Sequence, residues 1–383
     1  MTLKNLQKRA GRGLSTDRST GPHAVTKSKG PFATFAEQLF AIKLAGTSGS
    51  YGRTDPRLFE VVRRGQPAGA SEMIPSDGGF LIQSDFSAEI LLRAYNVGEV
   101  FKRCLQRPIN PKSNSYKFVA FDEQSRQNSS RLGGVRAYWI NEADSFTASK
   151  PRLRVSEIFA YKLIALLEAT SELTEDAEAY TEQMTDAFAQ EICFQVEQYV
   201  INGTGSGQIL GILNSPALIT VPKQSGQASQ TIIYSNIEGM LSSFWAKSLE
   251  SEGAVWLYNQ SALSQLAALT TVVGSGGSES KAWIWAPSVE DYNMLVGIPA
   301  LCSEYCPSLG NSGDLLLVDL SRFVLAVRGE LMRADISIHV LWLQDEQVFR
   351  FVCRIGGSTV DSTPVTPLFG TTKTSPFVAL ASR

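Results

Sequence analysis

The sequence predicts an α+β fold, on three observations. Residues 171–202 carry apolar side chains at steps of three and four, which is the period of one long amphipathic helix. Residues 115–121 and 152–167 have the composition and alternation of β-strands. Residues beyond 214 read as shorter helices and strands in mixed order. This mixture is typical of α+β proteins.

Residues 1–70 are expected to form an N-terminal arm rather than a domain. The first thirty residues hold seven Lys and Arg against a single acid, which is typical of a basic tail. Residues 32–45 form an amphipathic segment that is too short to be a stable helix alone. We therefore expect it to dock on the rest of the chain. Its apolar residues are Phe32, Phe35, Leu39, Phe40 and Leu44. Residues 46–70 are polar and broken by Gly and Pro.

Residues 71–167 predict the first compact element and a long hairpin. A turn and a short apolar strand at 75–82 precede a helix at 84–96. The strand at 115–121 is followed by a polar stretch with a glycine pair, an alternating piece at 135–140, and β-character from 152. Part of this hairpin is too polar to be buried. A hairpin that projects from its domain needs a partner outside it.

The long helix has clear ends. Ser171 and Thr174 are good N-cap residues, and the acids that follow them suit the positive end of the helix dipole. Asn202 and the glycines at 203, 205 and 207 end it. This glycine loop lacks the Lys-Ser/Thr end of a P-loop, and it follows a helix rather than a strand, so it predicts no phosphate site.

The second half of the chain predicts helices at 236–249 and 260–269. Strands are predicted at 254–258, 314–319, 323–328, 336–343 and 347–355. These strands continue the mixed pattern through the second half.

Composition argues against catalysis, a cofactor and a metal site. The chain has two histidines, too few for a multi-His metal site, and His339 lies in an apolar strand pattern where a packed residue is expected. Five scattered cysteines indicate buried thiols in a reducing compartment, with Cys302 and Cys306 lacking the second pair that a zinc site needs. The longest apolar runs fall short of the roughly 20 residues of a membrane span, and the N-terminus lacks the apolar core of a signal peptide, so we expect a cytoplasmic protein.

Charge is distributed unevenly along a chain whose formal net charge is only −2. Residues 102–154 hold eleven bases and four acids, whereas residues 163–222 hold nine acids and no base. This asymmetry suggests that the basic hairpin of one copy lies on the acidic helix of its neighbour. The alternative, two independent solvated surfaces, stays open. The candidate interface residues are Arg126, Arg131 and Arg136 on the hairpin and Glu175, Glu178, Glu182 and Asp186 on the helix.

Five motifs in order resemble one known family. They are PSDGGFLI at 75–82, the hairpin with GGVRAYW at 133–139 and ASKP at 148–151, INGTGSGQILGILN at 201–214, GDLLLVDL at 313–320, and SPFVAL at 375–380. Together they resemble the major capsid proteins of tailed bacteriophages, which have the Hong Kong 97-type fold. The resemblance spans about residues 32–383.

The resemblance implies a domain plan. The arm is 1–70, the peripheral domain is 71–120 and 152–214 with a spine helix at 171–202, the extended loop is 121–151, the axial domain is 215–339, and 340–383 returns to the peripheral domain. Some relatives crosslink a lysine of this loop to a neighbour's asparagine. Residues 121–149 contain no lysine, so we expect no crosslink. Only about thirty residues precede the arm helix, too few for a fused scaffold, so we expect a separate scaffolding protein or none.

The implied function is structural. Copies would self-assemble into hexamers and pentamers of an icosahedral shell around the double-stranded DNA of a tailed phage or prophage, with a portal as a further partner. The basic tail could contact the DNA through phosphates, engage the scaffold or a neighbouring copy, or remain a free tail. Assembly in the host cytoplasm would place the chain in the virion capsid. Three alternatives remain: a gene-transfer particle, a bacterial nanocompartment shell, whose proteins generally lack such an arm, and a nucleotide-dependent enzyme built on the glycine loop.

Overall fold

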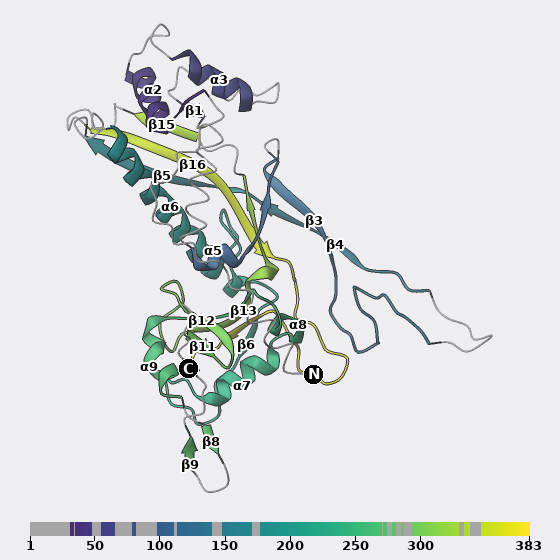
Figure 1. The fold of residues 1–383 in the computed structure, drawn as a ribbon. Helices are drawn as coiled ribbons and strands as arrows, with labels where there is room; N and C mark the ends of the chain where they lie inside the picture. The colour runs from purple at the N-terminus through teal and green to yellow at the C-terminus, as the bar shows by residue number, and fades with distance from the viewer. Residues whose placement is uncertain are drawn as a thin grey trace, which may run out of the picture.

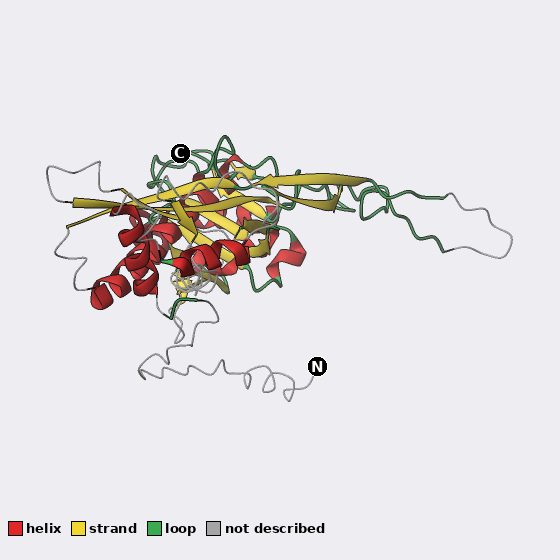
Figure 2. Cartoon of the chain, turned by 90° about the horizontal axis from the view of Figure 1, so that it is seen from above, coloured by secondary structure: helices red, strands yellow, loops and turns green. Residues whose placement is uncertain are grey.

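The computed structural model contains two large β-sheets, one long helix and a two-stranded ribbon that projects away from both sheets (Figure 1). Seen from above, the ribbon continues outward instead of folding back over the sheets (Figure 2). The structure describes residues 31–33, 35–47, 55–65, 79–81, 98–110, 113–139, 148–170, 177–269, 271–273, 278–280, 285–286, 293–328, 333–337 and 346–383.

The first sheet has six strands and is organised around β16, which is fourteen residues long. Its strands are β1 (Gly79–Leu81), β2 (Leu105–Pro108), β5 (Tyr161–Thr170), β14 (Phe323–Val327), β15 (Arg333–Ser337) and β16 (Glu346–Thr359). β16 pairs along ten residues with β5, and it also pairs with β15 and then with β14. This long strand therefore joins segments from three parts of the chain.

The long helix α6 (Ala177–Asn202) packs on the first sheet. Phe188, Ile192 and Val196 are buried at steps of four, and the ring of Phe188 lies 4.0 Å from that of Phe351 on β16. The predicted helix at 171–202 is thus confirmed from residue 177, and residues 171–176 lie outside the described part. The helix stops at Gly203, where a Cβ atom would lie 2.1 Å from the carbonyl oxygen of Ile209.

The second sheet has seven strands, in the order β10-β11-β12-β7-β13-β17-β6. They are β6 (Ile219–Val221), β7 (Ala254–Tyr258), β10 (Trp285–Ala286), β11 (Asn293–Leu295), β12 (Ile298–Cys302), β13 (Leu315–Asp319) and β17 (Phe377–Leu380). β7, β13 and β17 are buried at every residue because both faces of the sheet are covered.

The two faces of the second sheet belong to different cores. Val255, Leu316 and Phe377 join the large core that α6 and the first sheet share. Trp256 and Leu317, which alternate with them, pack under α7 (Tyr234–Ser243) and α9 (Leu263–Ala267). One continuous apolar core therefore joins the two sheets.

The strand pairing differs from the predicted domain boundaries. β14 and β15 were placed in the axial domain, 215–339, but they pair in the first sheet. β17 falls in 340–383, which was expected to be peripheral, but it pairs with β13 and β6 in the second sheet. The reason is that strands pair by position in space, and the chain crosses between the sheets at residues 320–322 and again at 360–376.

Local structure also differs from the sequence reading in the arm. Residues 46–70 were expected to be irregular, but α3 (Pro56–Gly65) forms there. Arg57 of α3 holds it to α2 (Phe35–Thr47) through an ion pair with Glu37 at 2.5 Å. On α2, the predicted docking side chain Leu39 is buried, as is Phe32 just before the helix, whereas Phe40 and Leu44 are exposed.

The helix predicted at 236–249 is broken in two. α7 ends at Ser243, and α8 (Ala246–Leu249) begins after two extended residues. The break arises because Trp245 N–H donates to the Ser375 carbonyl and Ser375 N–H donates to that of Ser243. The helix at 260–269 is a short 3-10 turn, η3 (Gln260–Ala262), followed by α9.

Other sequence expectations are partly met. Four cysteines are buried, and Cys302 is exposed. The predicted helix at 84–96 and His339 lie outside the described residues. β8 (Thr271–Val273) and β9 (Ser278–Ser280) form a small hairpin, and α5 (Glu99–Arg103) and β2 precede the ribbon. Among the helices that the structure describes, none is both long and apolar enough to cross a bilayer.

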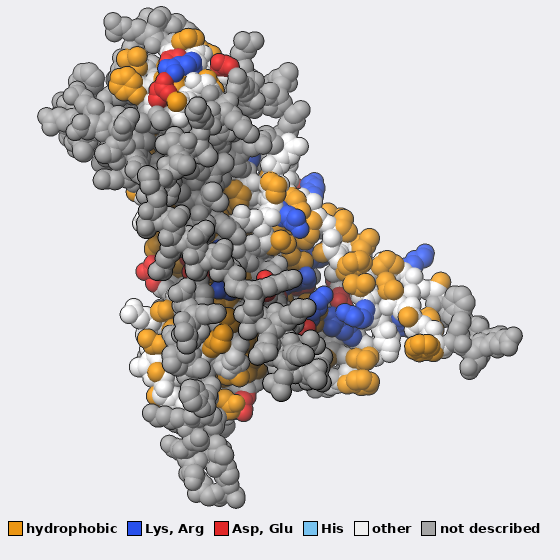
Figure 3. All heavy atoms as spheres, viewed as in Figure 1, with side chains coloured by type: hydrophobic (Ala, Val, Ile, Leu, Met, Phe, Trp, Pro, Cys, Tyr) orange, Lys and Arg blue, Asp and Glu red, His pale blue; other side chains and the backbone are white. Residues whose placement is uncertain are grey.

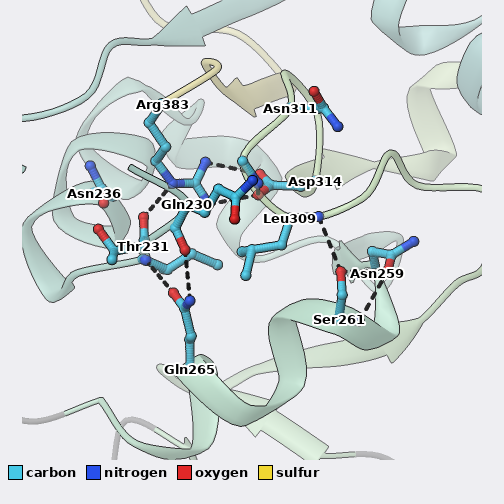
Figure 4. Close-up of polar contacts among 12 residues, drawn as sticks. Gln230, Thr231, Asn236, Asn259, Ser261, Gln265, Leu309, Asn311, Asp314 and Arg383 are labelled. Carbon is cyan, nitrogen blue, oxygen red and sulfur yellow. Dashed lines mark hydrogen bonds and ion pairs between the residues drawn. The ribbon is translucent and has the colours of Figure 1, made fainter. Parts of the chain in front are cut away.

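A fully buried ion pair holds one corner of the second sheet (Figure 4). Arg383 donates to both carboxylate oxygens of Asp314, at 3.0 and 2.6 Å, and also to the Thr231 carbonyl. Gln265 ties the same corner together by donating to the Gln230 carbonyl and accepting from the Ile232 amide. Neither charged side chain is exposed to solvent, so each buried charge is stabilised by the opposite charge of its partner.

We predict that Asp314→Asn lowers the unfolding free energy by about 3–5 kcal/mol, because it leaves the Arg383 guanidinium buried without a counter-charge. Urea denaturation of the unassembled chain measures this. Lys117→Gln, which breaks the exposed pair with Glu157, is the control and should change the midpoint very little. An equally small effect of Asp314→Asn would contradict the claim that the fold depends on the buried Asp314–Arg383 pair.

A second buried acid lies under α5. Glu197 of α6 is 7% exposed, and its Oε1 accepts from the amides of Val100 and Phe101 at 2.7 and 3.0 Å. Burial raises the pKa of Glu197 above its ordinary value, and the two amide donors only partly oppose this shift. The ionised form is therefore less favourable in the fold than in water.

We predict that Glu197→Gln raises the melting temperature most at neutral pH. A carboxyl whose folded pKa is raised adds stability at low pH, and that stability is lost as pH rises through the folded pKa. The glutamine can still accept from both amides, so its advantage should shrink as pH falls. Melting temperatures of both chains, measured from acidic to neutral pH, test this prediction. The control is Glu191→Gln, which makes the same change at an exposed position. A lower melting temperature for Glu197→Gln at every pH would refute it.

Candidate functional site: the extended loop and its root

The stem of the extended loop consists of β3 (Ser115–Phe121) and β4 (Leu153–Phe159), which pair antiparallel along all seven residues. The predicted strand at 115–121 is confirmed. The alternating piece at 135–140 was wrong as a strand over its described part, because residues 136–139 are irregular. A stem of this length spans about 24 Å, which carries the loop beyond its own sheets.

Beyond the stem the loop is held by backbone hydrogen bonds between the segment that follows β3 and the segment that precedes β4. Asp122 N–H donates to the Arg152 carbonyl, and Arg152 N–H donates to that of Gly133. Gly133 has a φ of +77°, and a Cβ there would lie 2.5 Å from the Arg152 carbonyl oxygen, so the turn requires glycine. A polar hollow of about 420 Å³ lies between these two segments of the loop, and Arg136 and Lys150 are among the residues that line it.

The inner face of the stem rests on the first sheet. Ile158 of the stem packs with Val324 and Ala326 of β14 in a small separate core, and Tyr116 and Phe118 of the stem pack against it. Gly356 lies where the stem leaves the sheet, and a Cβ on it would lie 2.1 Å from the Phe159 carbonyl oxygen. The glycine therefore allows the close crossing of β4 and β16.

The root of the extended loop is where residues 122–126 meet the 360–376 connection and the 244–245 corner. Thr366 N–H donates to the Gln124 carbonyl, and Arg126 N–H donates to the Thr366 carbonyl. The Arg126 guanidinium lies 5.2 Å from the centre of the Trp245 ring. Arg322, bonded through two nitrogens to Asp361, lies 5.6 Å from the same ring. Trp245 thus contacts two arginines from distant parts of the chain.

The predicted interface residues separate into four groups. Arg131 and Arg136 are exposed on the loop, whereas the Arg126 side chain is mostly covered and pairs with Glu123 at 2.8 Å within its own copy. Glu178, Glu182 and Asp186 lie in α6, and nothing of their side chains is described. Glu175 falls outside the described residues. Contact between the two sets across copies remains a prediction.

Sequence reasoning missed two features of this region. One is the apolar outer face of the stem, for which the unbroken run 118–121 was an available signal. The other is the root, whose members Arg126, Trp245 and Arg322 are too far apart in sequence to give any local signal.

The sequence matches the phage capsid family over residues 78–369, and the chain belongs to this family. It is a capsid shell protein, a structural component that associates with copies of itself. A search among curated proteins finds no match.

Solved structures agree on the fold. The capsid of a native GTA (gene-transfer agent) particle has a TM-score of 0.51 at 14% identity, covering 83% of this chain and 95% of that one. The capsid of an empty GTA particle has a TM-score of 0.53 at 12% identity, and the match covers 84% of this chain and 96% of that one. A structure from Mycobacterium phage Adephagia has a TM-score of 0.50 at 12% identity, and the match covers 74% of this chain and 89% of that one. The fold is the Hong Kong 97-type predicted from the motifs.

We predict that Trp245→Leu loosens the root, because both arginines lose the aromatic face, at roughly 0.5–1 kcal/mol each. Hydrogen exchange at the Arg126 and Thr366 amides, measured by NMR on the unassembled chain, should become faster. Trp245→Phe keeps an aromatic ring, so its exchange rates should lie between those of the wild type and those of the leucine variant. Unchanged exchange in the leucine variant would show that the ring does not hold the loop.

Proposed function

We propose that the chain is a major capsid protein whose copies form hexamers and pentamers of an icosahedral shell around the genome of a tailed phage or prophage. The family match over residues 78–369 carries this proposal. A gene-transfer particle is an equally compatible setting, since GTA capsids share the fold. The docked arm helices α2 and α3 favour a phage-type subunit over a nanocompartment shell, whose proteins generally lack such an arm.

The extended loop is the proposed contact between copies. It projects from its own subunit, and Arg131 and Arg136 are exposed on it. The acidic helix α6 of a neighbouring copy, with Glu178, Glu182 and Asp186, supplies the opposite charge, together with Glu175 before it. Arg126 is assigned instead to holding the root of the loop, because it already pairs with Glu123. Individual surface ion pairs contribute about 0–1 kcal/mol, so the charges set register and encounter rate.

Further partners follow from the same proposal. A separate scaffolding protein and a portal assist assembly in the host cytoplasm, and the mature chain resides in the virion capsid. The basic tail at 1–30 contacts packaged double-stranded DNA through phosphates without sequence preference. A structural subunit of this kind needs no cofactor.

Charge reversal tests the interface. The double variant Arg131→Glu/Arg136→Glu should assemble more slowly and to lower yield at low salt, and the deficit should shrink as salt screens the charges. Light scattering and negative-stain electron microscopy of wild-type and variant chain, each with its native assembly partners, measure this. The control is Lys223→Glu/Lys247→Glu, which makes the same charge change on exposed positions near the second sheet.

The outcomes separate two claims. Wild-type chain that forms no closed particles under any of these conditions would contradict the proposed shell function. Closed particles from the arginine variant, at wild-type rate and yield in low salt, would contradict only the electrostatic contact.

A further inference from the structure

The polar hollow of the extended loop has the size of a small-molecule site. Its volume of about 420 Å³ lies near the lower end of the roughly 300–1,000 Å³ of such sites. Most of them are lined by apolar side chains, whereas hydroxyl, amide and charged side chains line this one. Three of the charged side chains are bases, Arg136, Lys150 and Arg152. Figure 3 shows Lys and Arg side chains gathered on this part of the molecule. A ligand of matching chemistry is small and charged.

The charges around the hollow do not balance. Against the three bases, the lining contains two acids, Asp122 and Glu123. Glu123 is already neutralised, because Arg126 donates to both of its carboxylate oxygens, at 2.8 and 3.2 Å, from outside the lining. None of the ion pairs between described residues includes a base of the lining. Three cations therefore share the hollow with a single acid that is not paired with an arginine.

Hydrogen bonds between the two segments of the loop hold these bases near one another. Arg152 N–H donates to the Gly133 carbonyl at 3.0 Å. Arg136 N–H donates to the Ser149 hydroxyl at 3.1 Å, next to Lys150 in the sequence. The segments are thus joined at two places, and their like charges stay together at a cost in electrostatic repulsion.

The hydrogen-bonding groups of the lining match an oxyanion. Arginine and lysine side chains carry donors only, and one arginine can bind two oxygens of a phosphate at once. Hydroxyl and amide side chains add further donors, from Ser125, Ser130, Ser149, Gln124 and Asn128. A metal cation fits poorly, because the three bases repel it. Two or three linked phosphate groups carry enough negative charge for all three bases.

We propose that the hollow binds linked phosphate groups, which Arg136, Lys150 and Arg152 hold between the two segments of the extended loop. The phosphates neutralise the bases and bridge the segments, so they stiffen the loop of the unassembled chain. The inference goes beyond the proposed function and does not depend on assembly. The phosphates could belong to a free polyphosphate or to a nucleic acid, and the small volume of the hollow favours the free polyphosphate.

Binding to the unassembled full-length chain tests the proposal, with tripolyphosphate as the probe. Isothermal titration calorimetry at fixed ionic strength should show saturable binding of one tripolyphosphate per chain. Lys150→Gln/Arg152→Gln should weaken this binding about tenfold or more for each lost cation, as expected for a charge-assisted hydrogen bond. Arg136 is left unchanged, because it is also a proposed contact with a neighbouring copy.

Arg131→Gln is the matched control. Arg131 lies in the same loop and carries the same charge, but it does not line the hollow, so the dissociation constant should change by no more than about twofold. Urea denaturation should show that both variants fold, since the substituted side chains are exposed. No saturable binding by the wild type, or binding by Lys150→Gln/Arg152→Gln at wild-type affinity, would overturn the proposal.

Hydrogen exchange locates the bound anion. Tripolyphosphate should slow exchange at the Asp122 and Arg152 amides, which donate across the loop, and Lys150→Gln/Arg152→Gln should abolish this protection. Protection that appears only elsewhere in the chain would overturn the proposal.

A short single-stranded DNA separates the two sources of phosphate. We expect Lys150→Gln/Arg152→Gln to bind it as tightly as the wild type does, which supports a free polyphosphate as the ligand. Weaker DNA binding by this variant, with Arg131→Gln unchanged, would keep the phosphate site and assign it to nucleic acid.

Discussion

The stem of the extended loop depends on how it is held where it leaves the first sheet. Two strands alone are only marginally stable in water, so β3 and β4 need an apolar surface beneath them. β14 provides it, and Gly356 lets the stem cross β16 closely enough to use it. Arg126, clamped between Glu123 and the Trp245 ring, then fixes the first turn of the loop. A projecting loop with a defined direction follows from these contacts.

The same contacts link the loop to both sheets. Trp245 donates its backbone N–H to the carbonyl of Ser375, just before β17 of the second sheet, and Arg322 lies where the chain crosses between the sheets. Beneath them, one continuous core joins α6 to both sheets. A force on the loop is therefore transmitted to packed elements rather than absorbed by a flexible connection.

Sequence patterns predicted the parts that depend on local periodicity. The long helix, the strand at 115–121 and the strand at 254–258 follow directly from the spacing of apolar residues. Sheet membership did not, because β14, β15 and β17 choose partners by position in space. The break at residues 244–245 arises from bonds to Ser375, which no local signal reveals. Of the candidate site, the exposed Arg131 and Arg136 were accessible to charge counting, whereas the root and the apolar stem face were not.

The most direct test of the account is a high-resolution cryo-electron microscopy structure of the assembled particles. The account predicts that each loop reaches a neighbouring copy and that Arg131 and Arg136 lie beside the acidic helix of that copy. Particles in which the loop folds back on its own subunit would contradict it.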